Sequence, residues 1–550
     1  MSVFLSTLFL SLFITISLVP LFTKLALRFQ IVDIPDKRKV HARPVPRIGG
    51  AAMALAIFAV CLAFVPKDDF VNAFLIGAGI IIAFGLADDL FNLGYKTKFA
   101  GQIAAALVVI FYGDVKIVTL GNLIPAELCL SDWGSVLLTL LVIVGTTNAI
   151  NLSDGLDGLA AGISLLAFCC IAYLAYRTGM GNVMFIATAM AGAIFGFLRF
   201  NTYPATTFMG DGGSQLLGFS GIVLSIKLTQ ASAILSTLLP LYLFGLPILD
   251  TLLVMYQRVS EGRSPFHPDK NHIHHKLMRL GLFHTEAVFV IYLIQSVLVT
   301  ATLFFSTASE RILLLGYLIF AFTVLAAFIA AERYKIRMDR PHYIDKKIKA
   351  RLKVLKEKGV LIRFLFMSLK VALIAILLVA AMIPARIPPV LTLLGALSFL
   401  ILMLTLFTNK VPGESAVRLV YYVSVPYLIY LGTSNPIREL SAGLGTLYDL
   451  SFMLLAFLGI MTLKFTRRKK GFRFSTMDFL ILVIISILIF IPDEQVKSYH
   501  LGLLASKIII LFFSFEILVG ELRGEVRGLV LTTMLVCFAI VFRGFDLLVL

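Results

Sequence analysis

Two adjacent aspartates stand where a long apolar run meets a polar segment. Asp88 and Asp89 follow the apolar run 70–87, in the stretch FGLADDLFNLGYKTK. At the C-terminal end of a helix, the two like charges repel each other and also face the negative end of the helix dipole. A positive group must compensate for that cost. The sequence leaves three candidates open: a metal ion, a basic substrate, or a salt bridge with Lys96 or Lys98.

A second polar group interrupts the apolar sequence at NAINLSDGLDGLAAG, residues 148–162. Helix capping explains Asp157 alone, because a carboxylate is a preferred N-cap. It does not explain four amide and carboxylate side chains interleaved with glycines, which let a backbone approach a ligand closely. The segment therefore indicates a binding site. Its four polar side chains are Asn148, Asn151, Asp154 and Asp157.

A third polar segment, FMGDGGSQLLGF at 208–219, places Asp211 among glycines at the start of another apolar run. The segment is not a P-loop, because the glycine spacing and the lysine of that motif are missing. Asp211 is either a plain N-cap or a carboxylate held on a turn for a divalent ion. Oxygen ligands together with a phosphate are what magnesium favours.

Two further segments are basic. The loop 254–285 contains SPFHPDKNHIHHKLMRLG, and the segment 33–50 includes Arg38. A zinc site in the first loop is disfavoured, because no cysteine is near and the spacing matches no structural zinc site. Histidines beside lysine and arginine are more typical of an anion cradle, although a structural loop remains the alternative. Topology alone explains the charge of the second segment. The clustered histidines are His267, His272, His274 and His275.

These motifs lie in a chain of unusual composition. Of its 550 residues, 59% are hydrophobic and 14% are charged. A soluble globular protein is excluded, because such proteins are roughly half apolar and a quarter charged. Repeated apolar runs predict an all-α, polytopic integral membrane protein with about 18 transmembrane helices. The run 231–253 is expected to be one of them, and the first run, 3–23, is interpreted as a span rather than a signal peptide.

The basic residues predict the orientation of the chain. Loop lysines and arginines set topology, and placing most of them in the cytoplasm puts the N-terminus outside and all five motifs at the cytoplasmic face. The net charge of +17 then requires no nucleic-acid partner. The basic segment 332–363 divides the chain. We expect a catalytic core of about 11 spans at 1–335, a cytoplasmic linker at 336–360 and about 7 more spans at 361–550. This C-terminal part carries no comparable set of polar residues.

The five motifs together suggest one kind of chemistry. They offer carboxylates for a metal, basic groups for phosphates and helices open to lipid. Such a set suits phosphoryl transfer from a cytosolic nucleotide to a lipid acceptor, in which the protein mainly positions the reactants and neutralises charge. A transporter is a rival interpretation, but it predicts charges near span midpoints. A scaffold without catalysis is a second rival, and it predicts the loss of key carboxylates.

The order of the motifs resembles the polyprenyl-phosphate N-acetylhexosamine-1-phosphate transferase family over residues 1–335. The matching segments are DDLFNL, NAINLSDGLDG, FMGDGGS and PDKNHIHHKL. The resemblance implies transfer of a sugar 1-phosphate from a UDP-N-acetylhexosamine to polyprenyl phosphate, with release of UMP. It also implies that the enzyme requires Mg²⁺, for which Mn²⁺ can substitute. The protein would be a multi-pass protein of the bacterial plasma membrane that catalyses the first membrane step of envelope glycan synthesis, and it could form a homodimer. HIHH and RKVHARPVPRIGG resemble the N-acetylglucosamine branch, with undecaprenyl phosphate as acceptor. The phospho-N-acetylmuramoyl-pentapeptide transferase branch is the alternative.

The resemblance also implies roles for individual residues. It implies that Asp211 is the principal magnesium ligand and Asn151 a second one. It assigns Asp88 and Asp89 to the catalytic pair, Asp154 to another essential carboxylate and Asp157 to the uracil contact. Further catalytic, diphosphate-binding or sugar-binding residues implied by it are Asn92, Lys98, His272, His274 and His275, with Lys96 and Arg38 as weaker members.

Overall fold

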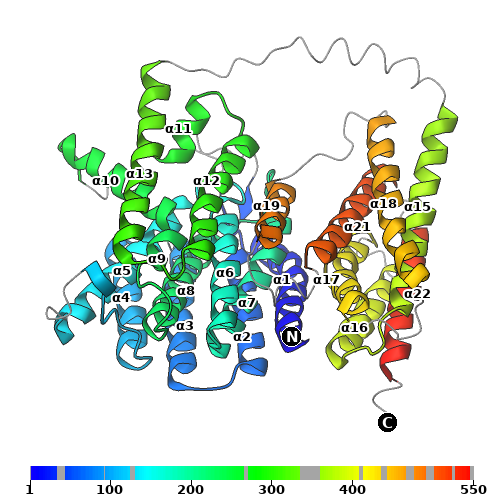
Figure 1. Cartoon of the computed structure of the whole chain (residues 1–550), viewed down its shortest axis with the longest axis horizontal. Helices are drawn as coiled ribbons and strands as arrows, with labels where there is room; N and C mark the ends of the chain where they lie inside the picture. The colour runs from blue at the N-terminus through cyan, green and yellow to red at the C-terminus, as the bar shows by residue number, and fades with distance from the viewer. Residues whose placement is uncertain are drawn as a thin grey trace. The chain divides into compact units, whose positions relative to one another are not determined.

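The computed structural model is almost entirely helical (Figure 1). Among the described residues it contains twenty α-helices, of which eleven are long and apolar enough to cross a membrane. Helices satisfy their own backbone hydrogen bonds, as a chain inside lipid must. The protein is therefore an all-α polytopic membrane protein. The described residues are 2–33, 44–91, 93–123, 130–264, 271–334, 359–407, 413–434, 442–465, 476–490, 501–522 and 527–545.

The eleven candidate spans agree with expected apolar runs on both sides of the basic segment. The remaining expected runs, apart from 231–253, also form helices, and the total of about 18 spans stays a prediction. The eleven helices are α1 (Ser2–Arg28), α3 (Asp69–Phe91), α5 (Asp132–Ser153), α6 (Leu159–Arg177), α7 (Gly181–Asn201), α12 (His284–Phe304), α13 (Glu310–Arg333), α15 (Gly359–Met382), α16 (Pro389–Phe407), α18 (Ala442–Phe465) and α22 (Arg527–Phe545). The other long helices are α2 (Gly49–Phe64), α4 (Tyr95–Phe111), α8 (Gly210–Gln230), α17 (Gly413–Ser434), α19 (Thr476–Phe490) and α21 (Leu501–Leu522).

The expectation of one span at 231–253 is wrong. The structure has the short helix α9 (Leu239–Leu243) followed by α10 (Gly245–Ser260). Pro247 has no amide proton, so it cannot donate to the carbonyl of Leu243 as a continuous helix requires. The side chain of Gln295 donates to that carbonyl instead, at 2.8 Å. The break is therefore stabilised by a polar side chain from α12.

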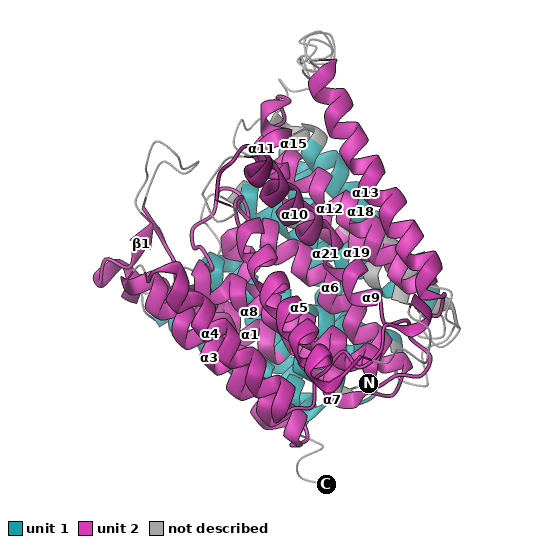
Figure 2. Ribbon diagram, turned by 90° about the vertical axis from the view of Figure 1, so that its left-hand side faces the viewer, with its two compact units in different colours: residues 1–9, 340–474, 488–550 teal, residues 10–339, 475–487 magenta. Residues whose placement is uncertain are grey.

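The chain forms two compact units (Figure 2). Unit 1 comprises residues 1–9, 340–474 and 488–550, and unit 2 comprises residues 10–339 and 475–487. The predicted linker at 336–360 lies mostly outside the described residues, so that boundary stays a prediction. Within unit 1, α17 is the central helix and contacts α15, α16, α21 and α22.

Helix α8 is the centre of unit 2. All its residues from Gly212 to Ile226 are buried, and it packs against α2, α3, α5, α6 and α7. Glycines permit this packing, because a Cβ on Gly85 would collide with the backbone of Gly212. The close approach brings the C-terminal end of α3 onto the N-terminal end of α8. The Asp88–Asp89 pair and Asp211 are thereby placed side by side.

A short antiparallel ribbon holds the segment before α8. Strand β1 (Val32–Asp33) pairs with β2 (Val45–Pro46). The chain then runs beside residues 208–209, because Phe208 donates its amide to the carbonyl of Pro46 at 2.8 Å and Gly50 donates to Met209 at 2.9 Å. The N-terminal basic segment is therefore tied directly to the turn that carries Asp211.

Candidate active site

Asp89 holds the first turn of α8. Its Oδ1 accepts a hydrogen bond from the amide of Asp211 at 3.0 Å, and its Oδ2 accepts one from Gly212 at 3.4 Å. The first amides of a helix lack partners within the helix, and a carboxylate there is favourable. Gly210 just before them has φ of +72°, which favours glycine. Asp89 therefore fixes the position of the Asp211 side chain.

Lys98 on α4 supplies the positive group that the Asp88–Asp89 pair requires. Its Nζ lies 2.6 Å from Asp88 Oδ2 and 2.5 Å from Asp211 Oδ2. Asp88 is buried, and its Oδ1 has no hydrogen-bond partner among the described residues. One ammonium thus serves two carboxylates, and one buried oxygen of Asp88 has no partner among the described residues.

A hydrogen-bond network of polar side chains joins α4, α5 and α8 beside these carboxylates. Ser214 donates its hydroxyl to Asn151 Oδ1 at 2.6 Å. Gln102 donates to Gln215 at 3.0 Å and accepts from Asn148 at 2.6 Å. Gln102, Gln215 and Ser214 were not among the predicted site residues. Their signal was a glutamine or serine inside an apolar run, where polar groups are expensive and often functional.

The DGLDG turn lies between α5 and α6. Asp154 is the C-cap of α5, and burial together with the charges of Asp211 and Asp157 raises its pKa to about 7. Asp157 is not the N-cap of α6, because Gly158 occupies that position with φ of +81°. Instead, Asp157 Oδ2 accepts a hydrogen bond from the amide of Ala205 at 2.9 Å. The side-chain oxygen of Asn201 accepts from the amide of Gly158 at 3.0 Å.

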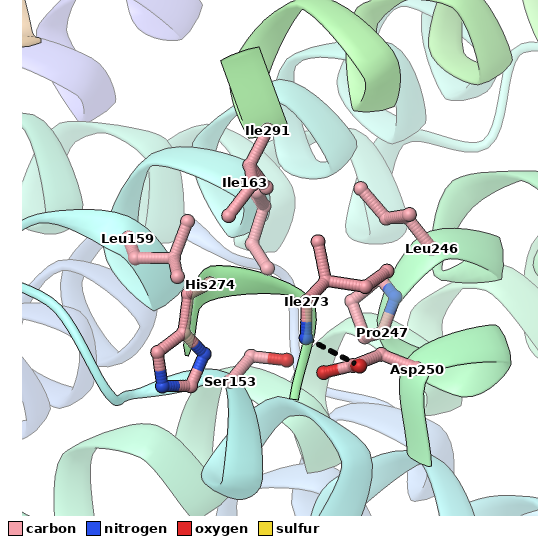
Figure 3. A pocket seen from close by; sticks show the side chains of 9 residues that line it. All are labelled: Ser153, Leu159, Ile163, Leu246, Pro247, Asp250, Ile273, His274 and Ile291. Atoms are coloured by element: carbon pink, nitrogen blue, oxygen red, sulfur yellow. Dashed lines mark hydrogen bonds between the residues drawn. The ribbon is translucent and has the colours of Figure 1, made fainter. Parts of the chain in front are cut away.

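The histidine loop is anchored by an aspartate that the sequence analysis missed. Asp250 on α10 lies 2.9 Å from Nδ1 of His272, and its other oxygen accepts the amide of Ile273 at 2.8 Å. Figure 3 shows this second bond and His274 beside a small cavity of about 20 Å³. Helix α11 (Ile273–Arg279) follows. Burial and the neighbouring His275 and His272 lower the pKa of His274 to about 3, so this imidazole is neutral at pH 7.

A cavity of about 280 Å³ is lined by six of the predicted residues. Asp89 and Lys98 contact Asp211 in its lining, and Asp88 contacts Lys98. The ring of His272 stacks on that of His274, which also lines the cavity. Predicted residues in its lining are Asn151, Asp154, Asp157, Asp211, His274 and His275. Lining residues that were not predicted include Asp33, Arg47, Asn201 and His284.

Some predicted residues are not brought to the cavity. Lys96 is exposed and is not part of the lining. Arg38, Asn92 and His267 lie outside the described residues. Arg47, a few residues after Arg38, lines the cavity and lies 2.5 Å from Asp33. The basic segment therefore contributes at least one arginine to the cavity.

The donor atoms suit magnesium better than zinc. Among the described residues, no three His, Cys, Asp or Glu side chains already converge as a metal site. Magnesium is usually held by one or two carboxylates together with water and substrate phosphates, and not by a cage of protein ligands. The carboxylate of Asp211 and the amide oxygen of Asn151, both from the cavity lining, are oxygen donors of this kind. The residues present fit that ion.

The fold and this cavity define a membrane-embedded enzyme for phosphorylated substrates. Residues 71–229 match the family described as Glycosyl transferase family 4. The chain is 36% identical over 322 residues to the "Probable undecaprenyl-phosphate N-acetylglucosaminyl 1-phosphate transferase" of Bacillus subtilis (strain 168), covering 58% of this chain and 89% of that relative. It is 38% identical over 304 residues to the "Decaprenyl-phosphate N-acetylglucosaminephosphotransferase" of Mycolicibacterium smegmatis, covering 49% and 74%.

A third relative gives the same result at lower identity. The "Undecaprenyl-phosphate alpha-N-acetylglucosaminyl 1-phosphate transferase" of Escherichia coli O157:H7 is 29% identical over 339 residues, or 58% of this chain and 91% of that relative. The chain belongs to glycosyl transferase family 4, the polyprenyl-phosphate N-acetylhexosamine-1-phosphate transferases. The resemblance drawn from the motifs is confirmed.

Proposed function

We propose that this enzyme transfers N-acetylglucosamine 1-phosphate from UDP-N-acetylglucosamine to a polyprenyl phosphate. An oxygen of the lipid phosphate attacks the phosphorus that carries the sugar, the bond from that phosphorus to the UMP oxygen breaks, and UMP leaves. The product is polyprenyl-diphosphate N-acetylglucosamine. The observation that carries this proposal is the position of Asp211, on the cavity wall and within 2.5 Å of Lys98. The names of the relatives support the sugar and the lipid.

Magnesium is the cofactor that the site suits, with manganese as a substitute. Asp211 and Asn151 would hold it, and when bound it supplies positive charge that neutralises the phosphate oxygens of the donor. The excess of carboxylates over cations around Asp211 favours such an ion. The raised pKa of Asp154 reflects the same excess of negative charge.

The chain's own residues position the phosphates. Lys98 places an ammonium beside Asp211, where it can contact a phosphate oxygen and so favour the charge that develops during transfer. Asp88 holds Lys98 and has an available oxygen for a proton. A phosphate monoester has a second pKa of about 6, so most lipid phosphate needs no base at neutral pH. Asp89 is a positioning residue, because both its oxygens contact backbone amides of α8.

The other cavity residues would bind the donor. His274 is neutral at pH 7, so it would contact the diphosphate or sugar through hydrogen bonds rather than through charge. His275 lies beside it, with ring centroids 4.2 Å apart. His272 would be oriented by Asp250. Asp157 would contact the uracil ring, as the resemblance implies, and Asn92, Lys96 and Arg38 remain predicted members of the donor site.

The topology is part of the same proposal. The chain would cross the membrane about 18 times, with its N-terminus outside. The cavity would then open at the cytoplasmic face, where a cytosolic nucleotide sugar can enter it. Residues 1–335 would form the catalytic core, 336–360 the linker and 361–550 a further membrane domain. The plasma membrane is the expected location, and a homodimer remains a prediction of the resemblance.

The test uses membranes that contain the full chain, labelled UDP-N-acetylglucosamine, undecaprenyl phosphate and a magnesium titration. We expect label to enter the organic phase with equal release of UMP, and Asp211→Asn to abolish both. Asp132→Asn is the matched control. Asp132 begins α5, whereas the cavity is reached near the other end of that helix, at Asn151. Transfer by Asp211→Asn at the wild-type rate, or transfer that ignores magnesium, would contradict the proposal. If the folded wild type does not transfer this sugar, a panel of other UDP-sugars and polyprenyl phosphates is tested next.

A further inference from the structure

One helix from the C-terminal half of the chain belongs to the transferase unit. Residues 475–487, the greater part of α19, belong to unit 2, whereas the segments before and after them belong to unit 1 (Figure 2). The sequence analysis expected this helix to be one of the spans of a separate C-terminal domain. It carries none of the recognised motifs, so the transferase function described above assigns no role to it.

The N-terminal half of α19 packs against α12 through side-chain contacts. The rings of Phe479 and Phe289, on α12, have centroids 4.4 Å apart at an angle of 41°. Aromatic pairs in such tilted arrangements contribute beyond the area that they bury. Thr476, Asp478 and Leu480 are all buried. Helix α12 is therefore one surface to which α19 is attached.

The first residue of α19 lies against the DGLDG turn. A Cβ on Gly158 would lie 3.6 Å from the hydroxyl of Thr476 and 3.4 Å from the hydroxyl of Tyr292. Tyr292, which is on α12 like Phe289, donates its hydroxyl to the carbonyl of Gly158 at 2.7 Å. Asn201 accepts the amide of the same glycine. Gly158 is thus held by two hydrogen bonds, and the Thr476 hydroxyl lies on the side where a Cβ of residue 158 would project.

We propose that α19 is a positioning element of the sugar-nucleotide site, by which the C-terminal half of the chain takes part in transfer. Thr476 and Phe479 pack α19 against Gly158 and α12, and this packing fixes the turn whose Asp154 and Asp157 line the cavity. The inference rests on the proposed function only for the identity of the substrate. A small displacement of such a turn is costly, because a misplacement of about 1 Å far from the chemistry can cost about 10²-fold in rate.

The packing is tested first, without any activity. Phe289 and Phe479 are both replaced by cysteine, a protease site is inserted between residues 345 and 346, and membranes are treated with a short bis-maleimide. We expect the two proteolytic fragments to remain joined. The matched control pairs Phe479→Cys with Val297→Cys, because Val297 lies on α12 about 12 Å further along the axis and is exposed. The single-cysteine variants report cross-links to native cysteines. Equal joining in test and control would overturn the proposal.

The role in positioning is tested next by kinetics. Thr476→Phe adds bulk beside Gly158, and we expect a fall in kcat/KM for UDP-N-acetylglucosamine of about tenfold, with the KM for the lipid changed less than about twofold. Thr476→Val keeps the shape and removes a buried hydroxyl that has no partner among the described residues, so it should behave like the wild type. Thr462→Phe, at an equally buried threonine of α18 in unit 1, is the control for overpacking elsewhere.

Two further outcomes also decide whether α19 positions the DGLDG turn. If Thr476→Phe fails to fold, Phe479→Ala removes packing without adding bulk and should lower the same kcat/KM by about threefold. Wild-type kinetics in both variants would overturn the positioning role even if the cross-link forms. If the wild type shows no transfer, the proposed function fails, and binding of labelled UDP to the same variants then replaces turnover as the readout.

Discussion

The two units use partly buried charge in opposite ways. In unit 1, Arg418 on α17 contacts both oxygens of Glu516 on α21, at 2.5 and 2.6 Å, and also contacts Glu414. Tyr422 donates to the same Glu516. In unit 2, Lys98 is shared between Asp88 and Asp211, and one oxygen of Asp88 has no partner among the described residues.

The difference separates a structural cluster from a candidate site. A buried ion pair recovers its desolvation cost only when the geometry is good and other hydrogen bonds satisfy the remaining groups. The Arg418 cluster meets that condition by itself, so it has little capacity left for a ligand. The carboxylates of unit 2 exceed the nearby cations and line a cavity. A substrate with phosphates and a cation would complete their interactions.

Among the variants that compare the two units, the largest effect is expected at Asp88. Asp88→Asn should lower kcat for transfer by about 10³-fold, because Lys98 loses one of its two carboxylate partners and is no longer held beside Asp211. Asp449→Asn is the matched control, since Asp449 pairs with Lys507 at 2.7 Å in unit 1. It should leave kcat unchanged. Equal losses in the two variants, measured in purified and correctly folded protein, would remove the distinction between the units.

Lys98 gives the next largest effect. Lys98→Gln should lower kcat/KM by about 10²-fold, because the site would lose the ammonium beside Asp211 that we propose contacts the donor phosphates. The corresponding variant in unit 1 is Lys507→Gln, which loses an ion pair and the aromatic contacts of Lys507 with Tyr448 and Phe452. We expect that variant to be less stable but fully active. Initial rates at saturating and limiting UDP-N-acetylglucosamine distinguish the two results.

A smaller effect tests how the histidine loop is held. Asp250→Asn should lower kcat/KM for the nucleotide sugar by about tenfold, because His272 loses the carboxylate that orients its ring. The amide of Ile273 keeps an oxygen acceptor in this variant, so the start of α11 should survive. Asp250→Glu tests whether charge alone is sufficient. If Asp250→Asn and the wild type have the same kinetics, His272 is held by the loop and not by Asp250.

The sequence predicted the parts of the site that are local. Asp88, Asp154 and Asp211 were recognisable because each is a charge at the end of an apolar run, next to glycine or a second acid. Eleven apolar helices could be predicted for a similar reason, since length and composition define a span. Both kinds of signal lie within about 20 residues of sequence.

Contacts between distant segments were not predictable. The break before α10 needed Pro247, which the sequence contains, and Gln295, which only packing brings to the carbonyl of Leu243. Asp250 meets His272 although 22 residues separate them. Arg418 and Glu516, 98 residues apart, form a charged cluster in a part of the chain where the sequence indicated none. Pairing between helices determines these contacts, and one sequence alone does not reveal which helices pair.

The smallest effect on transfer is expected from Arg418, and it tests the structural half of the comparison. Arg418→Met leaves Glu516, whose side chain is 14% exposed, without its arginine partner, which should destabilise unit 1 by about 3 kcal/mol. The double variant Arg418→Met with Glu516→Leu removes both charges, and it should recover most of the lost stability because neither buried charge is left unpaired. Thermal unfolding of the purified protein measures the stability, and transfer per folded molecule should match the wild type in both variants. A double variant as inactive as Asp88→Asn would mean that the Arg418 cluster is a functional site, and that saturated hydrogen bonding does not identify structural charge in this protein.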